Sequence, residues 1–407
     1  MNRLSTLIAF SLLLLAAPGA LALEKPRDWQ PPPIESVPNH REMWRSVIIE
    51  LGRYAKSRKP DFVVLVRNGS ELVVKGEREA EWDEVQDPDG RFFEKRHPLG
   101  QPFRPYVNAI DGLVLDNLYC GPEAFGKPLD KAIQEQRDLD RVLADERAKG
   151  IHRPATPQPL GPFSIDPVEE LRRAAEVKRQ AEKLERQRRT IYAVDAIRQA
   201  GRRILSLESC KTAKESQSAY ADAVRDKVLT YAHSGNDTLN LIPSGHPWGE
   251  NPAPIPTLNQ ARNWLPVLRA DQFGSKAEWV TALERSNHDM LLVDVAYRGV
   301  DGLAFADTLR LKYKKLGSRR LVFAVLSLGR AYDWRWYWQK DWQTGSPPFL
   351  FAPDEADPGA YVTRMEDAKW KELLGKTLEG IIKAGFDGVV LDDTDTYLWF
   401  EELMPLR

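Results

Sequence analysis

Residues 385–397 read GFDGVVLDDTDTY, and residues 111–119 read DGLVLDNLY. Both stretches contain Asp-Gly, a short run of Val and Leu, an aspartate, and a tyrosine a few residues later. An uninterrupted apolar run of this length is typical of a strand buried on both faces, as in a parallel sheet covered by helices. The two stretches therefore predict two equivalent strands that deliver Asp392 and Asp116 at their carboxyl ends.

Apolar segments of the same kind recur along the chain and are separated by helical patterns. We expect strands at 62–68, 110–117, 204–210, 264–271, 290–297, 321–329, weakly at 361–364, and at 386–393. Crossover helices are expected at 42–58, 277–285 and 370–384. Eight buried strands with helical crossovers predict an α/β fold of the (β/α)₈ TIM-barrel type, with a doubly wound open sheet as the alternative.

In a TIM barrel the reactive groups lie at the C-terminal ends of the strands. Here those ends are polar: Asn68, Asp116, Glu208, Asp294, Arg330 and the pair Asp392-Asp393. Cleavage of a glycosidic bond needs two carboxyl groups, one acting as nucleophile or base and one as general acid. Asp392 and Asp116 are the candidate catalytic pair, although a strand-end aspartate can also serve as a helix cap or turn residue.

An aromatic cluster follows the segment at 321–329. Residues 332–338 read YDWRWYW, with Trp342 behind them, in a chain with 12 Trp. Aromatic faces can stack on sugar rings, and Arg335 and Asp333 can bind hydroxyl groups. We expect this loop to bind sugar over the barrel mouth, and packing within the protein is the alternative for each single Trp.

The highly charged stretch from residue 122 to residue 203 interrupts the alternation of strands and helices. Asp166-Pro167 predicts a helix start, with an apolar stripe formed by Val168, Leu171, Ala175, Ala181, Leu184 and Ile191. We expect a solvated helical arm at 126–203, inserted between barrel parts at 23–125 and 204–407. The alternative is a coiled coil for an unknown protein partner.

The first 22 residues have the pattern of a cleaved signal peptide: Arg3, an apolar run at 7–17, and Ala20-Leu21-Ala22. The apolar run is too short for a stable membrane anchor, which must cross roughly 30 Å of hydrocarbon. The protein is therefore expected to be secreted or periplasmic. Cys120 and Cys210 follow two successive predicted strands, so in that compartment they are a candidate disulfide or, alternatively, two buried thiols.

The overall composition argues against several other functions. The 58 Lys plus Arg balance 59 Asp plus Glu, so nucleic acid and anionic membranes are not expected as partners. The six His have no metal-ligand spacing, and nucleotide-binding and serine-hydrolase motifs are absent, so no cofactor is expected. A Mg²⁺ or Ca²⁺ site at Asp392, Asp393 and Asp395 is a minor alternative.

The stretch 321–397 carries a more specific signal in VLSLGRAYDWRWYW, in Gly359 to Val362, in Trp370 and in GFDGVVLDDTDTYLWF. It resembles glycoside hydrolase family 114, the endo-α-1,4-polygalactosaminidase-like extracellular TIM barrels. The N-terminal part resembles the C-terminal half of that family: FVVLVRNG its sixth strand, AIDGLVLDNLYCG its seventh, and ILSLESC with residues 239–243 its eighth. The segment from Trp264 resembles the first strand. The resemblance implies a circularly permuted barrel with strand order 6-7-8-1-2-3-4-5.

The resemblance also implies roles for single residues. Asp392 matches the catalytic aspartate of strand five, Asp395 a second aspartate and Asn68 an asparagine position. Asp116 stands where the family has the glutamate of strand seven, and Arg330 replaces another glutamate; Glu208 is an alternative acid. The implied substrate-binding set is Asn68, Tyr119, Glu208, Asp294, Arg330, Tyr332, Trp334, Arg335, Trp338, Asp395 and Tyr397.

The function implied is that of an exported, endo-acting glycoside hydrolase whose substrate is a polysaccharide containing amino sugars. The two departures from the family pattern, at Asp116 and Arg330, make a non-catalytic glycan-binding barrel the second hypothesis.

Overall fold

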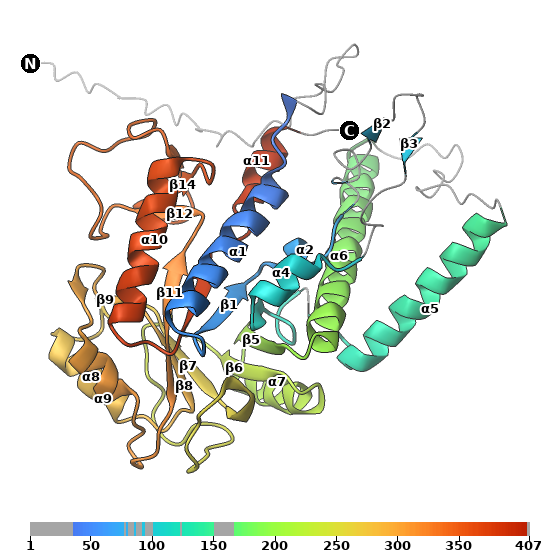
Figure 1. The fold of residues 1–407 in the computed structure, drawn as a ribbon. Coiled ribbons are helices and arrows are strands. Elements are labelled where there is room, and N and C mark those ends of the chain that lie inside the picture. Colours follow the sequence, from blue (N-terminus) through green and yellow to red (C-terminus); the bar gives the residue numbers. More distant parts are fainter. Residues whose placement is uncertain are drawn as a thin grey trace, which may run out of the picture.

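The computed structural model describes residues 36–76, 79, 85–86, 92–93, 101–122, 124–149 and 167–404. The signal peptide expected at residues 1–22 lies outside these ranges. Eight parallel strands form one sheet in the order β6-β5-β4-β1-β15-β11-β8-β7, surrounded by helices (Figure 1). The strands are β1 (Val63–Arg67), β4 (Gly112–Asp116), β5 (Arg203–Ser209), β6 (Leu229–His233), β7 (Trp264–Val267), β8 (Met290–Val293), β11 (Leu321–Ser327) and β15 (Gly388–Asp392). The prediction of a TIM-like α/β barrel is confirmed.

The barrel joins the two ends of the chain. β1 pairs with β15 on one side, with Leu65 opposite Val390, and with β4 on the other, with Leu65 opposite Gly112. The hydrogen-bonded ladder runs without interruption from β6 round to β7. At the seam between these two strands, the backbone N–H of Leu268 donates to the carbonyl of Leu239 at 2.8 Å. The sheet is therefore a nearly closed barrel.

The observed barrel strands differ from the predicted ones at two places. The weak segment at 361–364 is not a barrel strand: β14 (Ala360–Thr363) pairs antiparallel with β12 (Arg330–Tyr332) and β13 (Leu350–Pro353) in a separate small sheet. The eighth barrel strand is β6, which sequence reasoning missed because its LTYAH sequence lacks a run of Val, Ile or Leu. Counted from β7 as the first strand, the chain order is 5-6-7-8-1-2-3-4. Asp392 therefore ends the fourth strand and Asp116 the sixth, not the fifth and seventh.

The helices cover the outside of the barrel. α1 (His40–Arg58) lies beside α10 (Ala368–Lys383) and α11 (Tyr397–Leu403), so the first and last helices of the described chain are neighbours (Figure 1). Asn39 caps α1 and Asp367 caps α10 through side-chain oxygens that accept backbone N–H groups. Shorter helices elsewhere around the barrel are α2 (Ser70–Val73), α4 (Arg104–Ala109), α7 (Ala213–Arg225), α8 (Lys276–Glu284) and α9 (Phe305–Leu311).

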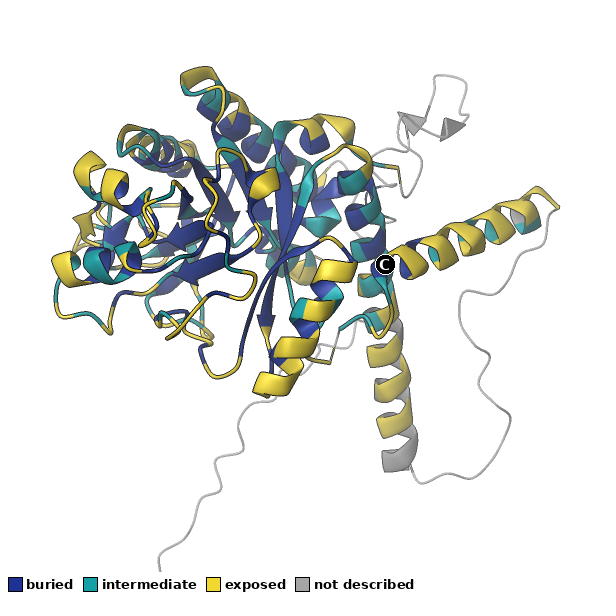
Figure 2. Ribbon diagram, turned by 90° about the horizontal axis from the view of Figure 1, so that it is seen from below, coloured by how far each residue is buried: buried dark blue, intermediate teal, exposed yellow. Residues whose placement is uncertain are grey.

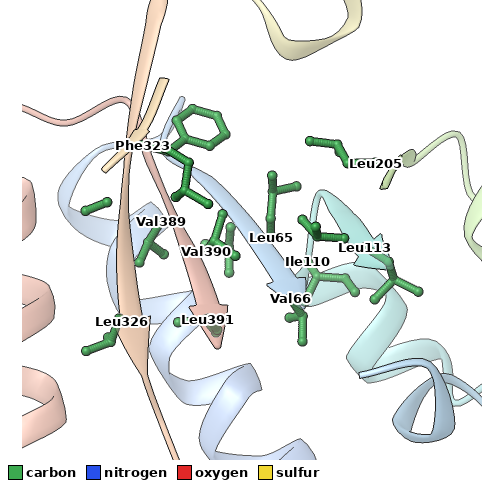
Figure 3. Packing of buried hydrophobic residues seen from close by; sticks show 14 of the residues in the cluster. Leu65, Val66, Ile110, Leu113, Leu205, Phe323, Leu326, Val389, Val390 and Leu391 are labelled. Carbon is green, nitrogen blue, oxygen red and sulfur yellow. The ribbon is translucent and has the colours of Figure 1, made fainter. Parts of the chain in front are cut away.

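The core is built from the apolar strands that the sequence pattern indicated. Figure 3 shows side chains of β1, β4, β5, β11 and β15, including Leu65, Phe323 and Val390, packed together, and these three are fully buried. The largest buried side chains include Trp44, Trp264, Trp279 and Trp370. A third of the 12 tryptophans thus belong to the core rather than to a binding surface.

The charged stretch forms two long helices, α5 (Leu129–Ala148) and α6 (Pro167–Gln199), whose outer parts are exposed (Figure 2). α6 starts at Pro167, as Asp166-Pro167 predicted. The expected apolar stripe is not buried along its length: Ile191 is buried, but Leu184 is 64% exposed. The carboxyl-terminal part of α6 therefore acts as the crossover helix to β5, and the rest protrudes. None of the helices within the described ranges is long and apolar enough to cross a membrane.

Candidate active site

A cavity of about 760 Å³ opens at the carboxyl ends of the barrel strands. It is called the mouth cavity here. Its lining is strongly charged and contains Arg67, Asp237, Arg269, Asp271, Asp294, Arg298, Arg335, Asp357, Asp392 and Asp393, together with Tyr332 and Trp334. The lining contains more aspartates than arginines, so the mouth cavity is acidic overall although arginine side chains also lie in it.

Arg67, the last residue of β1, connects the two candidate catalytic aspartates. Its guanidinium donates to both carboxylate oxygens of Asp116, at 3.0 and 2.8 Å, and to Oδ2 of Asp392 at 3.0 Å. Burial opposes the charge of Arg67, but the two carboxylates outweigh this effect and raise its pKa above the ordinary value. The structure thus brings Asp392 and Asp116 together on one cation.

Asp393 follows Asp392 and has the left-handed backbone conformation, with φ 55°. Its carboxylate accepts hydrogen bonds from Ser327 Oγ and the Arg330 guanidinium, and from Tyr332 Oη at 3.4 Å. Burial, with added repulsion from Asp392, raises the pKa of Asp393 to about 6, although Arg330 opposes the shift. Asp393 is therefore a carboxyl group in the mouth that can hold or release a proton near neutral pH.

Asp116 lies at the border of a second cavity, of about 430 Å³. We call it the α6 pocket because Arg186, Gln187 and Thr190 of α6 form one wall. The other walls include Asn68, Asp116, Asp395, Tyr397 and Phe125. Asn68 donates from its amide to Asp116 Oδ2 at 2.9 Å and accepts the Asp116 backbone N–H at 3.1 Å, so it fixes the carboxylate in place. Four predicted site residues, Asn68, Asp116, Asp395 and Tyr397, thus meet in this pocket.

Glu208 does not reach either cavity. It is fully buried, and its carboxylate accepts the backbone N–H groups of Leu118, Tyr119 and Cys120 at 2.9 to 3.1 Å. Burial raises its pKa in spite of these hydrogen bonds. Glu208 therefore anchors the loop after β4. It is not placed to act as the alternative acid or to bind a substrate. Tyr119 also lines neither of the two cavities.

The same loop is tied to the end of β5 by a disulfide. Cys120 and Cys210 are bonded, with 5.1 Å between their Cα atoms. The alternative of two buried thiols is therefore wrong. The disulfide and Glu208 together fix the segment that follows Asp116.

The aromatic loop divides between two places. Tyr332, Trp334 and Arg335 line the mouth cavity, where Arg335 Nη1 lies 2.5 Å from Asp294 Oδ1. Trp338 packs instead against Trp342 and Tyr361, with ring centroids 5.4 and 5.0 Å apart, and borders a groove outside the mouth. The expectation of an aromatic loop over the mouth is therefore met by Tyr332 and Trp334 and not by Trp338.

Arg330 is a supporting residue at the mouth. It connects Asp393 with Asp354, to whose Oδ2 its Nε donates at 2.6 Å, and it is not among the residues that line the mouth cavity. The two carboxylates raise its pKa against the effect of burial. Its guanidinium holds Asp393 in place, and because it does not line the cavity we assign it no contact with a substrate.

The sequence analysis missed Arg67 and named Asp393 only as a strand-end acid and as part of an alternative Mg²⁺ or Ca²⁺ site. The signal for Arg67 was present, since it is a single cation directly after an apolar run and is the last residue of β1, as Asp116 and Asp392 are the last residues of β4 and β15. In the described part of the chain, no three His, Cys, Asp or Glu side chains are grouped so that they could hold a metal ion.

Comparison with known proteins gives short matches. The chain is 28% identical over 123 residues to an uncharacterized protein of Methanocaldococcus jannaschii, covering 30% of this chain and 35% of that protein. It is 36% identical over 80 residues to an uncharacterized protein of Thermotoga maritima, and 38% identical over 78 residues to one of Deinococcus radiodurans. Each of these two matches covers 19% of this chain and 25% of the relative. The chain thus spans about a third or a quarter of the length of these relatives, and no family model matches it.

Proposed function

We propose that this protein is an exported glycoside hydrolase that cleaves a polysaccharide containing amino sugars. The observation that carries the proposal is the meeting of Asp392 and Asp116 on Arg67 at the mouth of a barrel. Two carboxyl groups from different strands, held in a fixed relation, are what hydrolysis of a glycosidic bond needs. Trp334 in the same cavity offers an apolar face for a sugar ring.

In this proposal Asp392 acts as nucleophile or as the base that activates water, and Asp116 is the general acid. Asp393 is a second candidate for the acid, because its pKa is raised to about 6 and it lines the same cavity as Asp392. Arg67 is a positioning residue that fixes the Asp392 and Asp116 carboxylates. The surplus of aspartates over arginines in the mouth favours a substrate with protonated amino groups.

Export is supported by the Cys120–Cys210 disulfide, because such bonds persist in oxidising compartments. A second candidate function, a non-catalytic glycan-binding barrel, is favoured by one observation. Both candidate carboxylates already pair with Arg67, an arrangement that can hold a sugar without turning it over.

The test is the release of reducing ends from α-1,4-linked polygalactosamine and galactosaminogalactan-like polysaccharides. Asp392→Asn should lower turnover by roughly 10⁴-fold, as removal of a catalytic carboxylate does. Asp61→Asn, an exposed aspartate outside both cavities, is the matched control and should keep wild-type activity. Binding of these glycans without turnover would support the second function. Activity that a chelator abolishes and Mg²⁺ restores would support a carboxylate-metal hydrolase instead.

A further inference from the structure

The arm helix α6 is fixed against the barrel beside the candidate site. Its Lys183 donates to the carbonyl of Pro122 at 2.5 Å, in the loop after β4. Arg189 Nη1 lies 3.1 Å from Glu71 Oε2 on α2, and Ile191 and Val194 belong to the buried core. α6 therefore touches the loops after β1 and β4, the two strands that carry Arg67 and Asp116.

The α6 pocket begins at Asp116, one member of the candidate catalytic pair. Asp116 lines this pocket, whereas Asp392 lines the mouth cavity, and the Arg67 guanidinium is hydrogen-bonded to both. A glycan that passes over the two carboxylates would therefore have sugar units in the mouth cavity on one side and in the α6 pocket on the other. At about 430 Å³ the α6 pocket falls within the usual size range of small-molecule sites.

The lining of the α6 pocket has the mixture of groups that sugar rings require. Gln187 and Thr190 bring an amide and a hydroxyl group to the pocket, which also donate to the Ala124 carbonyl at 3.4 Å and the Arg186 carbonyl at 3.0 Å. Phe125, Leu118 and Leu398 offer apolar surface. Burial raises the pKa of Asp395, with added repulsion from Asp392 and Asp116, although the cation of Arg330 opposes the shift. The Asp395 carboxyl lines the pocket and adds a further polar group that sugar hydroxyls can contact.

We propose that the α6 pocket is a sugar-binding subsite next to the catalytic pair, and that the inserted arm determines part of the specificity through Gln187 and Thr190. This inference rests on the proposed function, and it assigns a role to the arm. The ligand expected in the α6 pocket is a neutral or amino-bearing sugar unit, and it belongs to the same polysaccharide molecule that reaches Asp392. The arm helix would then favour long chains, because only these occupy both cavities.

The test uses α-1,4-linked galactosamine oligosaccharides of increasing length and the full-length protein. In Thr190→Trp the indole would fill the pocket from a half-buried position on the helix, and in Gln187→Ala a hydrogen-bonding group is removed. Each change should lower kcat/KM for the longest chains by roughly 10-fold, as the loss of one or two hydrogen bonds does, and change it less than twofold for the shortest cleaved chain.

The matched controls are Gln180→Trp and Gln180→Ala. Gln180 is exposed on the same helix, bonds to Glu176, and lies about 15 Å along the axis from Thr190. Both controls should keep the length dependence of the wild type. Equal losses for short and long chains, or equal effects at positions 180 and 190, would overturn the inference.

Binding separates this inference from the proposed function. If the wild type turns over none of these oligosaccharides, their affinity is measured on Asp392→Asn protein with and without Thr190→Trp. Weaker binding of long chains in the double variant supports the subsite although hydrolysis has failed. Unchanged or undetectable binding overturns the subsite as well.

Discussion

Strands β4 and β15 carry the two related segments of the sequence, and their amino-terminal ends are built alike. Asp111, before β4, accepts the backbone N–H of Val64 at 2.8 Å, and Asp387, before β15, accepts that of Val322 at 3.0 Å. Each aspartate also pairs with lysine and arginine side chains at the base of the barrel. The shared Asp-Gly thus ties each strand to a neighbouring one.

The carboxyl-terminal ends of the same two strands differ. Asp116 accepts a two-pronged contact from Arg67, and the next residue, Asn117, accepts the backbone N–H of Ser209 at 3.0 Å. Asp392 accepts one contact from Arg67, and the next residue is the buried acid Asp393. Asn117 and Asp393 share the left-handed conformation, with φ 57° and 55°. The same left-handed backbone conformation therefore places a neutral amide, Asn117, after one strand and a titratable carboxyl, Asp393, after the other.

The first half of the repeated pattern therefore stabilises the fold, and the second half supplies polar groups of the candidate site. The amino ends can be disturbed only at the expense of stability, whereas the carboxyl ends can be changed with specific effects on charge and pH dependence.

The largest effect is expected from the glycines of the repeated Asp-Gly. A Cβ atom on Gly112 would lie 2.2 Å from the carbonyl oxygen of Arg203, and one on Gly388 would lie 2.5 Å from that of Val63. Since both obstacles are backbone atoms, each Gly→Ala change should lower the free energy of unfolding by about 3 kcal/mol or more, with Gly112 the worse. Urea denaturation followed by circular dichroism measures this.

Gly375 provides the control, because a Cβ atom there meets no heavy atom within 4 Å and the residue lies in α10. Gly375→Ala should stabilise the protein by about 0.5 to 1 kcal/mol. If Gly112→Ala and Gly388→Ala were as harmless, the Asp-Gly halves would have no structural role.

The sequence was sufficient for the barrel, for seven of its strands and for the position of Asp116 and Asp392 at strand ends, because long apolar runs and the acids that follow them are local patterns. It was insufficient for β6, whose Thr and His are buried in the barrel and interrupt the apolar run. The residues around a strand end also do not show whether its side chain faces the mouth cavity. Glu208 stands at a strand end like Asp116, but three backbone N–H groups of the loop after β4 bind its carboxylate and remove it from the mouth. Likewise, Trp334 and Trp338 are four residues apart but border different cavities.

An intermediate effect is expected at Arg67, the link between the two strand ends. Arg67→Met leaves Asp116 and Asp392 without their cation in a partly buried site. We expect the free energy of unfolding to fall by about 2 kcal/mol at neutral pH, less than for a fully buried pair because about a fifth of the Arg67 side chain is exposed. Turnover should fall as well, because neither carboxylate would keep its orientation.

Arg137→Met is the matched control, because Arg137 makes a comparable two-pronged contact with Asp195 on the exposed arm. That exposed ion pair should contribute less than about 1 kcal/mol. Similar losses of stability in the two variants would show that Arg67 is not a specific link between the strands.

The smallest effect is expected at Asp393, where β15 departs most from β4. Its pKa is raised from the ordinary value of 3.8 to about 6, so the folded protein binds the proton more tightly than the unfolded chain. The stability due to this group is present below about pH 4 and is lost as the pH rises through 6. Between pH 4 and 7 the wild type should therefore lose about 1 to 2 kcal/mol of unfolding free energy relative to Asp393→Asn, and Asp61→Asn should follow the wild type.

The same variant decides which carboxyl is the acid. If Asp393 donates the proton, kcat/KM of the wild type falls above about pH 6, and Asp393→Asn loses both this limb and most of the activity. If Asp116 donates it, Asp393→Asn keeps most of the activity, and Asp116→Asn loses it. Wild-type activity in both variants would show that neither strand end supplies the acid, and the difference between β4 and β15 would then have no catalytic role.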